Sequence, residues 1–336
     1  MTTRREALAA GLGFAAAPSL GLADGAPSTA PIAAEEYWAD KAGVRLWVYR
    51  KRAQAAPRGG LFLVHGSSYS GKTMFDLSVP GRDYSMMDHF ARLGFDVWTM
   101  DHEGYGHSQK TEGNSDIQSG VEDLKAAMAV VGKAAGIPPR LAFFGQSSGA
   151  LRAARFANQH PGHVDKLALD AFVWTGKDSP TLAARKKNLP QYQASNRRPV
   201  SAEFYRSVFT RDHSGASEPM LGDIIAAEEM KYGDSVPTGT YVDMTTKLPL
   251  VDPEKVSCPV LITRAEHDGI ATDEDILAFY ARLPNPDKQL VKISGLAHTA
   301  PLGVNRARFF HALEAFLTMP ARVDLHGEKG SGAGHA

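Results

Sequence analysis

The segment from Gly145 to Gly149, with the sequence Gly-Gln-Ser-Ser-Gly, constrains the fold of this chain more than any other feature. It directly follows the apolar run Leu141–Phe144 and precedes an alanine-rich segment that is typical of a helix. Strand, sharp turn, serine and helix are the parts of a nucleophile elbow, whose turn strains the serine backbone and needs small neighbours. The pattern predicts that the hydroxyl of Ser147 stands clear of a sheet, although an ordinary strand-to-helix turn can carry the same short pattern.

Strands that alternate with helices predict a doubly wound, mostly parallel sheet of the α/β class. The length of 336 residues allows one large α/β domain, with or without an insertion. We expect its core in residues 35–174 and 255–320. Apolar runs and alternation predict strands at 44–48, 61–64, 95–100, 141–144, 166–174, 259–263 and 289–293, and apolar periodicity predicts helices at 86–93, 117–131 and 308–317.

Residues 175–254 interrupt this alternation with helical pieces, many charges and no clear buried strand. We expect a helical cap inserted between two strands of the sheet. We expect some of its apolar side chains to pack as a satellite core and a few to face the substrate cleft. These side chains are Tyr192, Phe204, Tyr205, Phe209, Met220, Met230, Tyr232 and Met244.

The two ends of the chain are not expected to belong to the fold. Arg4 and Arg5 precede a short, mildly apolar stretch interrupted by Pro18, a pattern typical of a twin-arginine export signal and too short for a membrane span. We therefore expect residues 1–34 to be an export signal and linker of a periplasmic or secreted protein without a stable membrane anchor. A cytosolic extension is the alternative. Residues 321–336 are polar and rich in glycine, which predicts a disordered tail.

The charge balance and the cysteine content exclude several kinds of partner and cross-link. Lys plus Arg and Asp plus Glu both number 37, so no net basic field exists to attract nucleic acid or an anionic membrane. Cys258 is the single cysteine, which rules out an internal disulfide and leaves a buried apolar role as the expectation. The oligomeric state is not indicated by the sequence.

Three expected strand ends carry a serine, an acid and a histidine in that order. Ser147 ends the strand at 141–144, Asp268 follows the strand at 259–263, and His298 follows the strand at 289–293. The carboxyl ends of parallel strands meet at one edge of the sheet, so these side chains can converge. His298 could take the proton of the Ser147 hydroxyl, and Asp268 could orient the imidazole and stabilise its cation. Glu266, His267 and Asp170 are competitors for the role of Asp268.

An attacked carbonyl also needs hydrogen-bond donors for the negative charge that forms on its oxygen. The elbow predicts one donor, the backbone N–H of Ser148. The second is expected from the loop after the strand at 61–64, as the backbone N–H of Ser67. The side chains of Ser68 or Tyr69 could add to it.

Two other patterns suggest different chemistry and are interpreted as less specific. Residues 66–73 fit the phosphate-binding pattern Gly-x4-Gly-Lys-Thr, but Pro80 and Gly81 interrupt the long helix that such a loop must open. Residues 101–108 hold two histidines and two acids, yet consecutive loop residues rarely converge on one metal ion, and a glycine-rich structural turn is favoured.

With these motifs in order, the chain resembles the α/β-hydrolase superfamily, in its serine esterase and lipase-like branch, from about residue 35 to residue 320. The resemblance rests on five segments, at residues 65–68, 101–108 and 145–149 and in the Asp268 and His298 loops. It implies an eight-stranded sheet, a variable cap, no cofactor, no metal and a Ser-His-Asp hydrolytic mechanism. A serine at position 147 argues against the epoxide hydrolase and haloalkane dehalogenase branches, which attack through a carboxylate.

The predicted function is that of a serine hydrolase for a small, fairly apolar carboxylic ester, with an acyl group carried on Ser147. The apolar character is inferred from the aromatic and methionine side chains of the cap. Lactone, amide, thioester or carbon–carbon bond hydrolysis would use the same three residues. A non-catalytic ligand-binding homologue and a nucleotide-binding protein are more distant alternatives.

Overall fold

An eight-stranded sheet forms the centre of the molecule in the computed structural model, which describes residues 30–53, 57–135 and 139–323. The strand order is β1-β2-β4-β3-β5-β6-β9-β10; β2 is antiparallel to both its neighbours, and the other pairs are parallel. The predicted mostly parallel sheet is thereby confirmed. Its strands are β1 (Ala33–Lys41), β2 (Val44–Arg52), β3 (Gly59–Val64), β4 (Phe95–Met100), β5 (Leu141–Gln146), β6 (Val164–Asp170), β9 (Val260–Ala265) and β10 (Lys288–Ile293).

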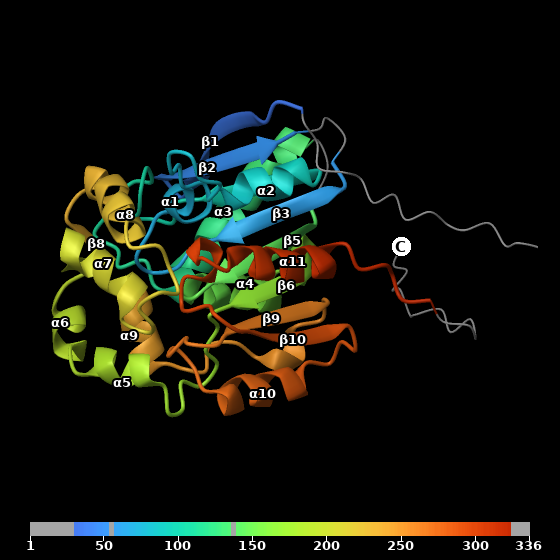
Figure 1. Cartoon of the computed structure of the whole chain (residues 1–336). Helices are drawn as coiled ribbons and strands as arrows, with labels where there is room; N and C mark the ends of the chain where they lie inside the picture. Colours follow the sequence, from blue (N-terminus) through green and yellow to red (C-terminus); the bar gives the residue numbers. More distant parts are fainter. Residues whose placement is uncertain (1–29, 54–56, 136–138, 324–336) are drawn as a thin grey trace, which may run out of the picture.

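Helices cover both faces of this sheet, because its central strands are apolar on both sides. In β3, Leu61 and Leu63 belong to one buried cluster, whereas Phe62 and Val64 belong to the cluster on the opposite face. The first cluster is completed by α1 (Gly71–Phe75), α2 (Met86–Arg92) and α11 (Arg306–Leu317). The second is completed by α3 (Ile117–Ala135), α4 (Ser148–Gln159) and α10 (Asp273–Arg282) (Figure 1).

Two details of the sheet differ from the prediction. The edge strand β1 was not predicted, because Ala39 is its one buried residue and the strand therefore lacks an apolar alternation. The strand expected at 166–174 ends at Asp170, where Ala171 takes a φ of 50° that no strand can continue. The carboxyl edge of β6 thus lies four residues earlier than expected.

Between β6 and β9 the chain forms a group of short helices with one small sheet. Figure 1 shows this group at the left, beyond the ends of the parallel strands. Two three-residue strands, which are too short to show a periodicity in the sequence, pair antiparallel within this group. The elements are α5 (Pro180–Lys186), α6 (Leu189–Ala194), β7 (Arg197–Pro199), α7 (Ala202–Thr210), α8 (Leu221–Glu229), β8 (Ser235–Pro237) and α9 (Gly239–Thr246). The limits of the cap at 175 and 254 stay a prediction.

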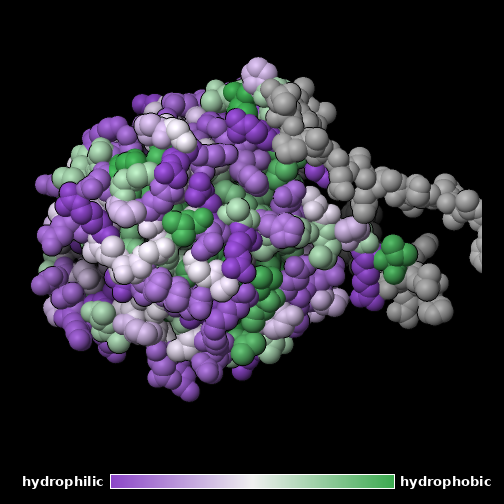
Figure 2. Space-filling view, in the orientation of Figure 1, coloured by the Kyte–Doolittle hydropathy of each residue, from purple (hydrophilic) through white to green (hydrophobic). Residues whose placement is uncertain are grey.

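The predicted terminal segments fall mostly outside the described residues. Residues 1–29 of the expected export segment and residues 324–336 of the expected tail are not described, and β1 already begins at Ala33, inside the expected linker. Within the described part of the chain, we find no helix with the length and apolar character needed to cross a bilayer. Polar residues cover most of the face shown in Figure 2, where apolar residues occur in small groups.

Candidate active site

Ser147 occupies the sharp turn between β5 and α4, with φ 57° and ψ −124°. Residues other than glycine rarely adopt this backbone conformation, so the turn is strained. A Cβ atom added to Gly145 would lie 2.5 Å from the carbonyl oxygen of Gly149, and one added to Gly149 would lie 2.1 Å from the carbonyl oxygen of Val64. Both glycines are therefore required by backbone packing, and the nucleophile elbow has the predicted form.

The structure brings the three predicted side chains together. His298 Nε2 lies 3.1 Å from Ser147 Oγ, and His298 Nδ1 lies 2.9 Å from Asp268 Oδ1. All three side chains are buried. Serine, imidazole and carboxylate thus form one hydrogen-bonded row at the carboxyl edge of the sheet, in the geometry that proton transfer from the hydroxyl needs.

The loops that carry His298 and Asp268 are held by hydrogen bonds of their own. Gln146 Nε2 donates to the carbonyl oxygen of His298 at 2.7 Å, which ties this loop to the residue before the nucleophile. Arg264 Nη1 donates to the carbonyl oxygen of Asp268 at 2.6 Å, and the backbone N–H of Ile270 donates to Asp268 Oδ1 at 2.9 Å. Such contacts fix the row without a ligand in place.

Asp268 and Asp170 are both buried, but they differ in charge. Burial raises the pKa of Asp268, yet the nearby His298 and its hydrogen bond outweigh this effect and hold the pKa below its usual value. Burial raises the pKa of Asp170 to about 8, against a hydrogen bond from Thr263 that lowers it. At neutral pH Asp268 is the ionised partner, whereas Asp170 is mostly protonated.

The other competitors for the acid position do not contact His298. Glu266 is exposed and accepts a hydrogen bond from the backbone N–H of Gly295 at 2.7 Å. His267 lies 3.5 Å from Glu266 and stacks on the His213 ring at a centroid distance of 3.9 Å. Of the candidates weighed from the sequence, Asp268 is the one that the structure places against the imidazole.

The two predicted backbone donors lie beside Ser147. Ser148 is the first residue of α4, where helical N–H groups have no partner within the helix, and Ser67 lines the same cavity as Ser147. Their hydroxyls form a chain in which Thr240 donates to Ser67 at 2.8 Å and Ser67 donates to Ser148 at 2.7 Å. The described residues provide no acceptor for either N–H group, so both stay free to donate to a substrate oxygen.

The segment at residues 66–73 does not have the structure of a phosphate-binding loop. Its helix α1 has only five residues. The N–H groups that would face a phosphate are used within the protein: Ser70 N donates to Glu229 Oε1 at 2.9 Å, and Gly71 N donates to Asp101 Oδ1 at 2.7 Å. The Lys72 ammonium lies over the Tyr49 ring at 5.3 Å.

The turn at residues 101–108 is structural, as favoured from the sequence. Asp101 accepts from Gly71 N and from His107 N, while His102 N donates to His65 Nε2 at 3.0 Å. Among the described residues, the one group with metal-ligand spacing is Asp212, Asp268 and His298. Both ring nitrogens of His298 already lie at hydrogen-bonding distance from Ser147 and Asp268, which fits a proton-transfer row better than a metal site.

The cavity at Ser147 is small and polar in this conformation. Its volume is about 20 Å³, close to the space that one water molecule requires, so an organic substrate can enter only if cap side chains shift. The lining includes Ser67, Tyr69, Ser147 and His298 from the core and Arg185, Val208 and Arg211 from the cap. Sequence analysis missed Arg185 and Arg211, because charged residues in a helical segment usually face solvent.

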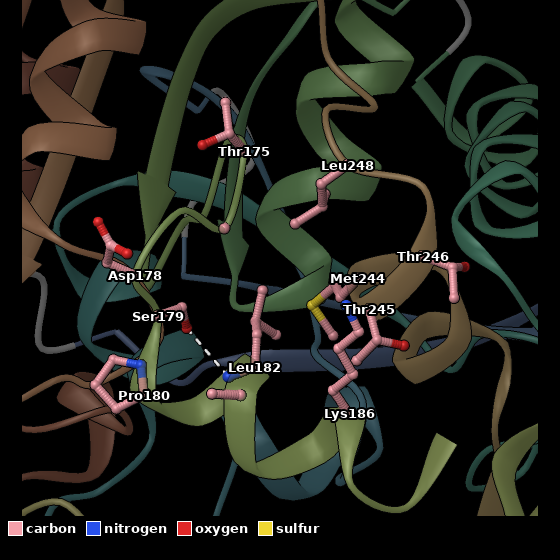
Figure 3. Close-up of a pocket in the computed structure, with 12 residues that line it drawn as sticks. Thr175, Asp178, Ser179, Pro180, Leu182, Lys186, Met244, Thr245, Thr246 and Leu248 are labelled. Atoms are coloured by element: carbon pink, nitrogen blue, oxygen red, sulfur yellow. Dashed lines mark hydrogen bonds between the residues drawn. The ribbon is translucent and has the colours of Figure 1, made fainter. Parts of the chain in front are cut away.

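The apolar lining expected from the cap is not found at this cavity. None of the eight aromatic and methionine side chains named above belongs to its wall. Tyr205 and Phe209 instead pack against Tyr69, with ring centroids 5.9 and 6.3 Å apart. A larger groove of about 600 Å³ is lined by residues of α5 and α9, where the side chains of Leu182 and Met244 lie near each other (Figure 3).

Comparison with known proteins identifies the family. Residues 56–302 match the family described as serine aminopeptidase, S33, and this range contains Ser147, Asp268 and His298. The chain belongs to this family. It is therefore a hydrolase of the α/β-hydrolase superfamily, as the resemblance in the sequence implied. No curated protein matches the sequence.

Solved structures of low sequence identity share the fold. An esterase from Exiguobacterium antarcticum is 15% identical, with a TM-score of 0.62 over 83% of this chain and 98% of that one. The enol-lactonase from Burkholderia xenovorans is 18% identical, with a TM-score of 0.61 over 84% and 100%. A 2-hydroxy-6-oxo-6-phenylhexa-2,4-dienoate hydrolase from Rhodococcus is 17% identical, with a TM-score of 0.63 over 85% and 100%.

Proposed function

We propose that the protein is a serine hydrolase that cleaves a small carboxylic ester through an acyl group carried on Ser147. The observation that carries the proposal is the hydrogen-bonded row of Ser147, His298 and Asp268 at the carboxyl edge of the sheet. The strained turn at Ser147 and the free N–H groups of Ser67 and Ser148 supply the remaining parts of this chemistry.

In the proposed reaction, Ser147 Oγ attacks the ester carbonyl while His298 Nε2 accepts the hydroxyl proton. The backbone N–H groups of Ser67 and Ser148 donate to the oxygen on which negative charge develops. The ionised Asp268 stabilises the imidazolium, which then gives its proton to the leaving alcohol. A water molecule, activated by His298 in the same way, releases the acid and restores the serine.

The same three residues could also hydrolyse other types of bond. The enol-lactonase and the dienoate hydrolase named above share the fold, and the family name refers to an aminopeptidase. We place carboxylic esters ahead of amides and carbon–carbon bonds because an alcohol leaves more easily than an amine or a carbanion. A lactone, an amide and a thioester serve as alternatives in the test.

The test compares the wild-type protein with Ser147→Ala on benzyl pentanoate, a lactone, an anilide and a thioester of the same acyl chain. We expect hydrolysis of the ester by the wild type and a loss of at least a thousandfold in kcat in the variant. Undiminished ester turnover in Ser147→Ala would exclude the proposed nucleophile, and turnover of another substrate alone would reassign the scissile bond.

We also propose that the amino-terminal segment directs export through a twin-arginine route. The support is the Arg4-Arg5 pair followed by a short, mildly apolar stretch. The test is the amino-terminal mass of protein recovered from the periplasm of the producing cells. The small residues Gly21 and Ala23, separated by Leu22, offer a cleavage site, so a mature chain that begins after Ala23 is expected. A full-length chain confined to the cytosol would contradict the proposal.

A further inference from the structure

Arg185 of the cap is a buried cation with no acidic partner among the described residues. Its guanidinium donates to the thioether of Met244 at 3.8 Å and lies over the ring of Tyr241 at 4.1 Å. A thioether sulfur is a weak acceptor, and a guanidinium carries five N–H donors. Buried charges are ordinarily paired with a full opposite charge, whereas Arg185 has no carboxylate within hydrogen-bonding distance among the described residues, and the phenol of Tyr241 is its strongest partial counter-charge there.

The surroundings of Arg185 add positive charge, and the two carboxylates at the site, Asp212 and Asp268, lie against Arg211 and His298. Burial lowers the pKa of Arg185, and the neighbouring cations Arg211 and Arg198 lower it further, whereas Tyr241 acts in the opposite direction. Arg198 also lies over the Tyr241 ring, 4.2 Å from its centroid, and donates to the carbonyl oxygen of Ser67 at 3.1 Å. Burial alone would raise the pKa of the Tyr241 hydroxyl, but the three arginines lower it to about 7. The region therefore has a strong positive potential.

This positive region faces the cavity that holds Ser147. Arg185 and Arg211 both line it, together with Ser147 and His298. Arg211 is partly exposed and pairs with Asp212 at 3.3 Å, which leaves Arg185 as the unpaired cation of the wall. Because Ser147 and Arg185 line the same cavity, a short molecule attached to Ser147 would lie beside the guanidinium once cap side chains shift to admit it.

We propose that Arg185, assisted by Arg211, binds a carboxylate of the substrate, so that the preferred ester is a monoester that carries a free carboxylate a few carbons from the scissile bond. The inference rests on the proposed function and names the substrate class of that site. The planar guanidinium matches a carboxylate in a two-pronged contact. Stacking on Tyr241 holds that plane in place, which lowers the entropy lost on binding.

A purely structural role is the competing explanation. In that case Arg185 would only hold α5 against α9 through Tyr241 and Met244. The two explanations differ in their effect on substrate choice, because a structural arginine has no reason to distinguish a charged ester from a neutral one of equal length.

The test uses three esters: benzyl pentanoate, monobenzyl glutarate and 4-carboxybenzyl pentanoate. Benzyl pentanoate is uncharged, monobenzyl glutarate carries a carboxylate on the acyl side of the ester bond, and 4-carboxybenzyl pentanoate carries one on the alcohol side. The wild-type kcat/KM for one of the two charged esters is expected to exceed that for benzyl pentanoate about 10- to 100-fold, as for hydrogen bonds to a charged group. Equal values, or a preference for the neutral ester, would overturn the proposal.

Variants locate the effect at Arg185. Arg185→Gln and Arg185→Met are expected to lose the preference, because kcat/KM should fall at least tenfold more for the preferred charged ester than for benzyl pentanoate. Arg140→Met is the matched control, since Arg140 is exposed and pairs only loosely with Asp165, at 3.7 Å. A preference that persists in folded Arg185 variants would contradict the assignment. If neither variant folds, the wild-type ratio and the binding measurement below decide.

Binding separates this inference from the proposed function. Calorimetry on the wild-type protein compares glutarate, its uncharged diamide and inorganic phosphate. We expect glutarate to bind at least tenfold more tightly than either, and equal affinities, or tighter binding of phosphate, would refute a carboxylate subsite. If no ester is cleaved but glutarate binds selectively, the proposed function fails and the subsite stands.

Discussion

The strained backbone of Ser147 makes a prediction about stability that is independent of any substrate. A residue with a side chain held at φ 57° and ψ −124° stores about 1–3 kcal/mol, which glycine would not. Glycine also loses more freedom on folding, by about 0.5–1 kcal/mol relative to alanine. Ser147→Gly should therefore be more stable than Ser147→Ala, by up to about 2.5 kcal/mol, although both lack the nucleophile.

The measurement is urea unfolding of both variants at pH 7, with the midpoint and slope fitted for each. The control is the same pair at Ser207, an exposed residue inside helix α7, where glycine should be less stable than alanine by about 1 kcal/mol. The sign is thus expected to reverse between the two positions. If Ser147→Gly is the weaker of its pair, as at an ordinary helical position, the elbow is unstrained and the reasoning fails.

Three further substitutions test the site and its surroundings. Asp268→Asn should lower kcat about 10³- to 10⁴-fold for the cleaved ester, because the imidazole loses its ionised partner; a fall below tenfold would argue for another acid. Asp170→Asn should become more stable relative to the wild type as the pH rises from about 4 to about 8, because the unfolded carboxyl ionises near 3.8 and the folded one near 8. Unfolding at a series of pH values checks this, and a difference that does not change with pH would contradict a protonated Asp170. Gly149→Ala should lower the free energy of unfolding by about 2 kcal/mol or more, because its Cβ would lie 2.1 Å from the carbonyl oxygen of Val64. Gly162→Ala is the control: a Cβ there would have no atom within 4 Å, so thermal unfolding should show almost no change.

The central sheet could be predicted because burial on both faces leaves continuous apolar runs, as in β3 and β5. The edge strand β1 could not, since Ala39 is its one buried residue and the polar positions around it carry no strand signal. The early end of β6 depends on the positive φ of Ala171, and an alanine in the sequence does not indicate a positive φ.

The row of Ser147, Asp268 and His298 could be predicted because chain order and strand ends place its members at one edge. Glycines at 145 and 149 added a steric requirement that the packing shows directly. Arg185 could not be found in this way, because its burial depends on how α5 packs against Met244 and Tyr241 of α9. The aromatic residues of the cap led to the prediction of an apolar lining at the cavity, which the structure does not show, because composition does not indicate which side chains face a cavity.

The central claim, that His298 activates Ser147 as a nucleophile, is tested most directly by labelling with a fluorophosphonate followed by intact-mass and peptide mass spectrometry. The wild-type protein should gain one adduct, located on Ser147, and His298→Ala should react at least a hundredfold more slowly while Ser147→Ala stays unlabelled. An adduct on another residue, or labelling of His298→Ala at the wild-type rate, would contradict the account.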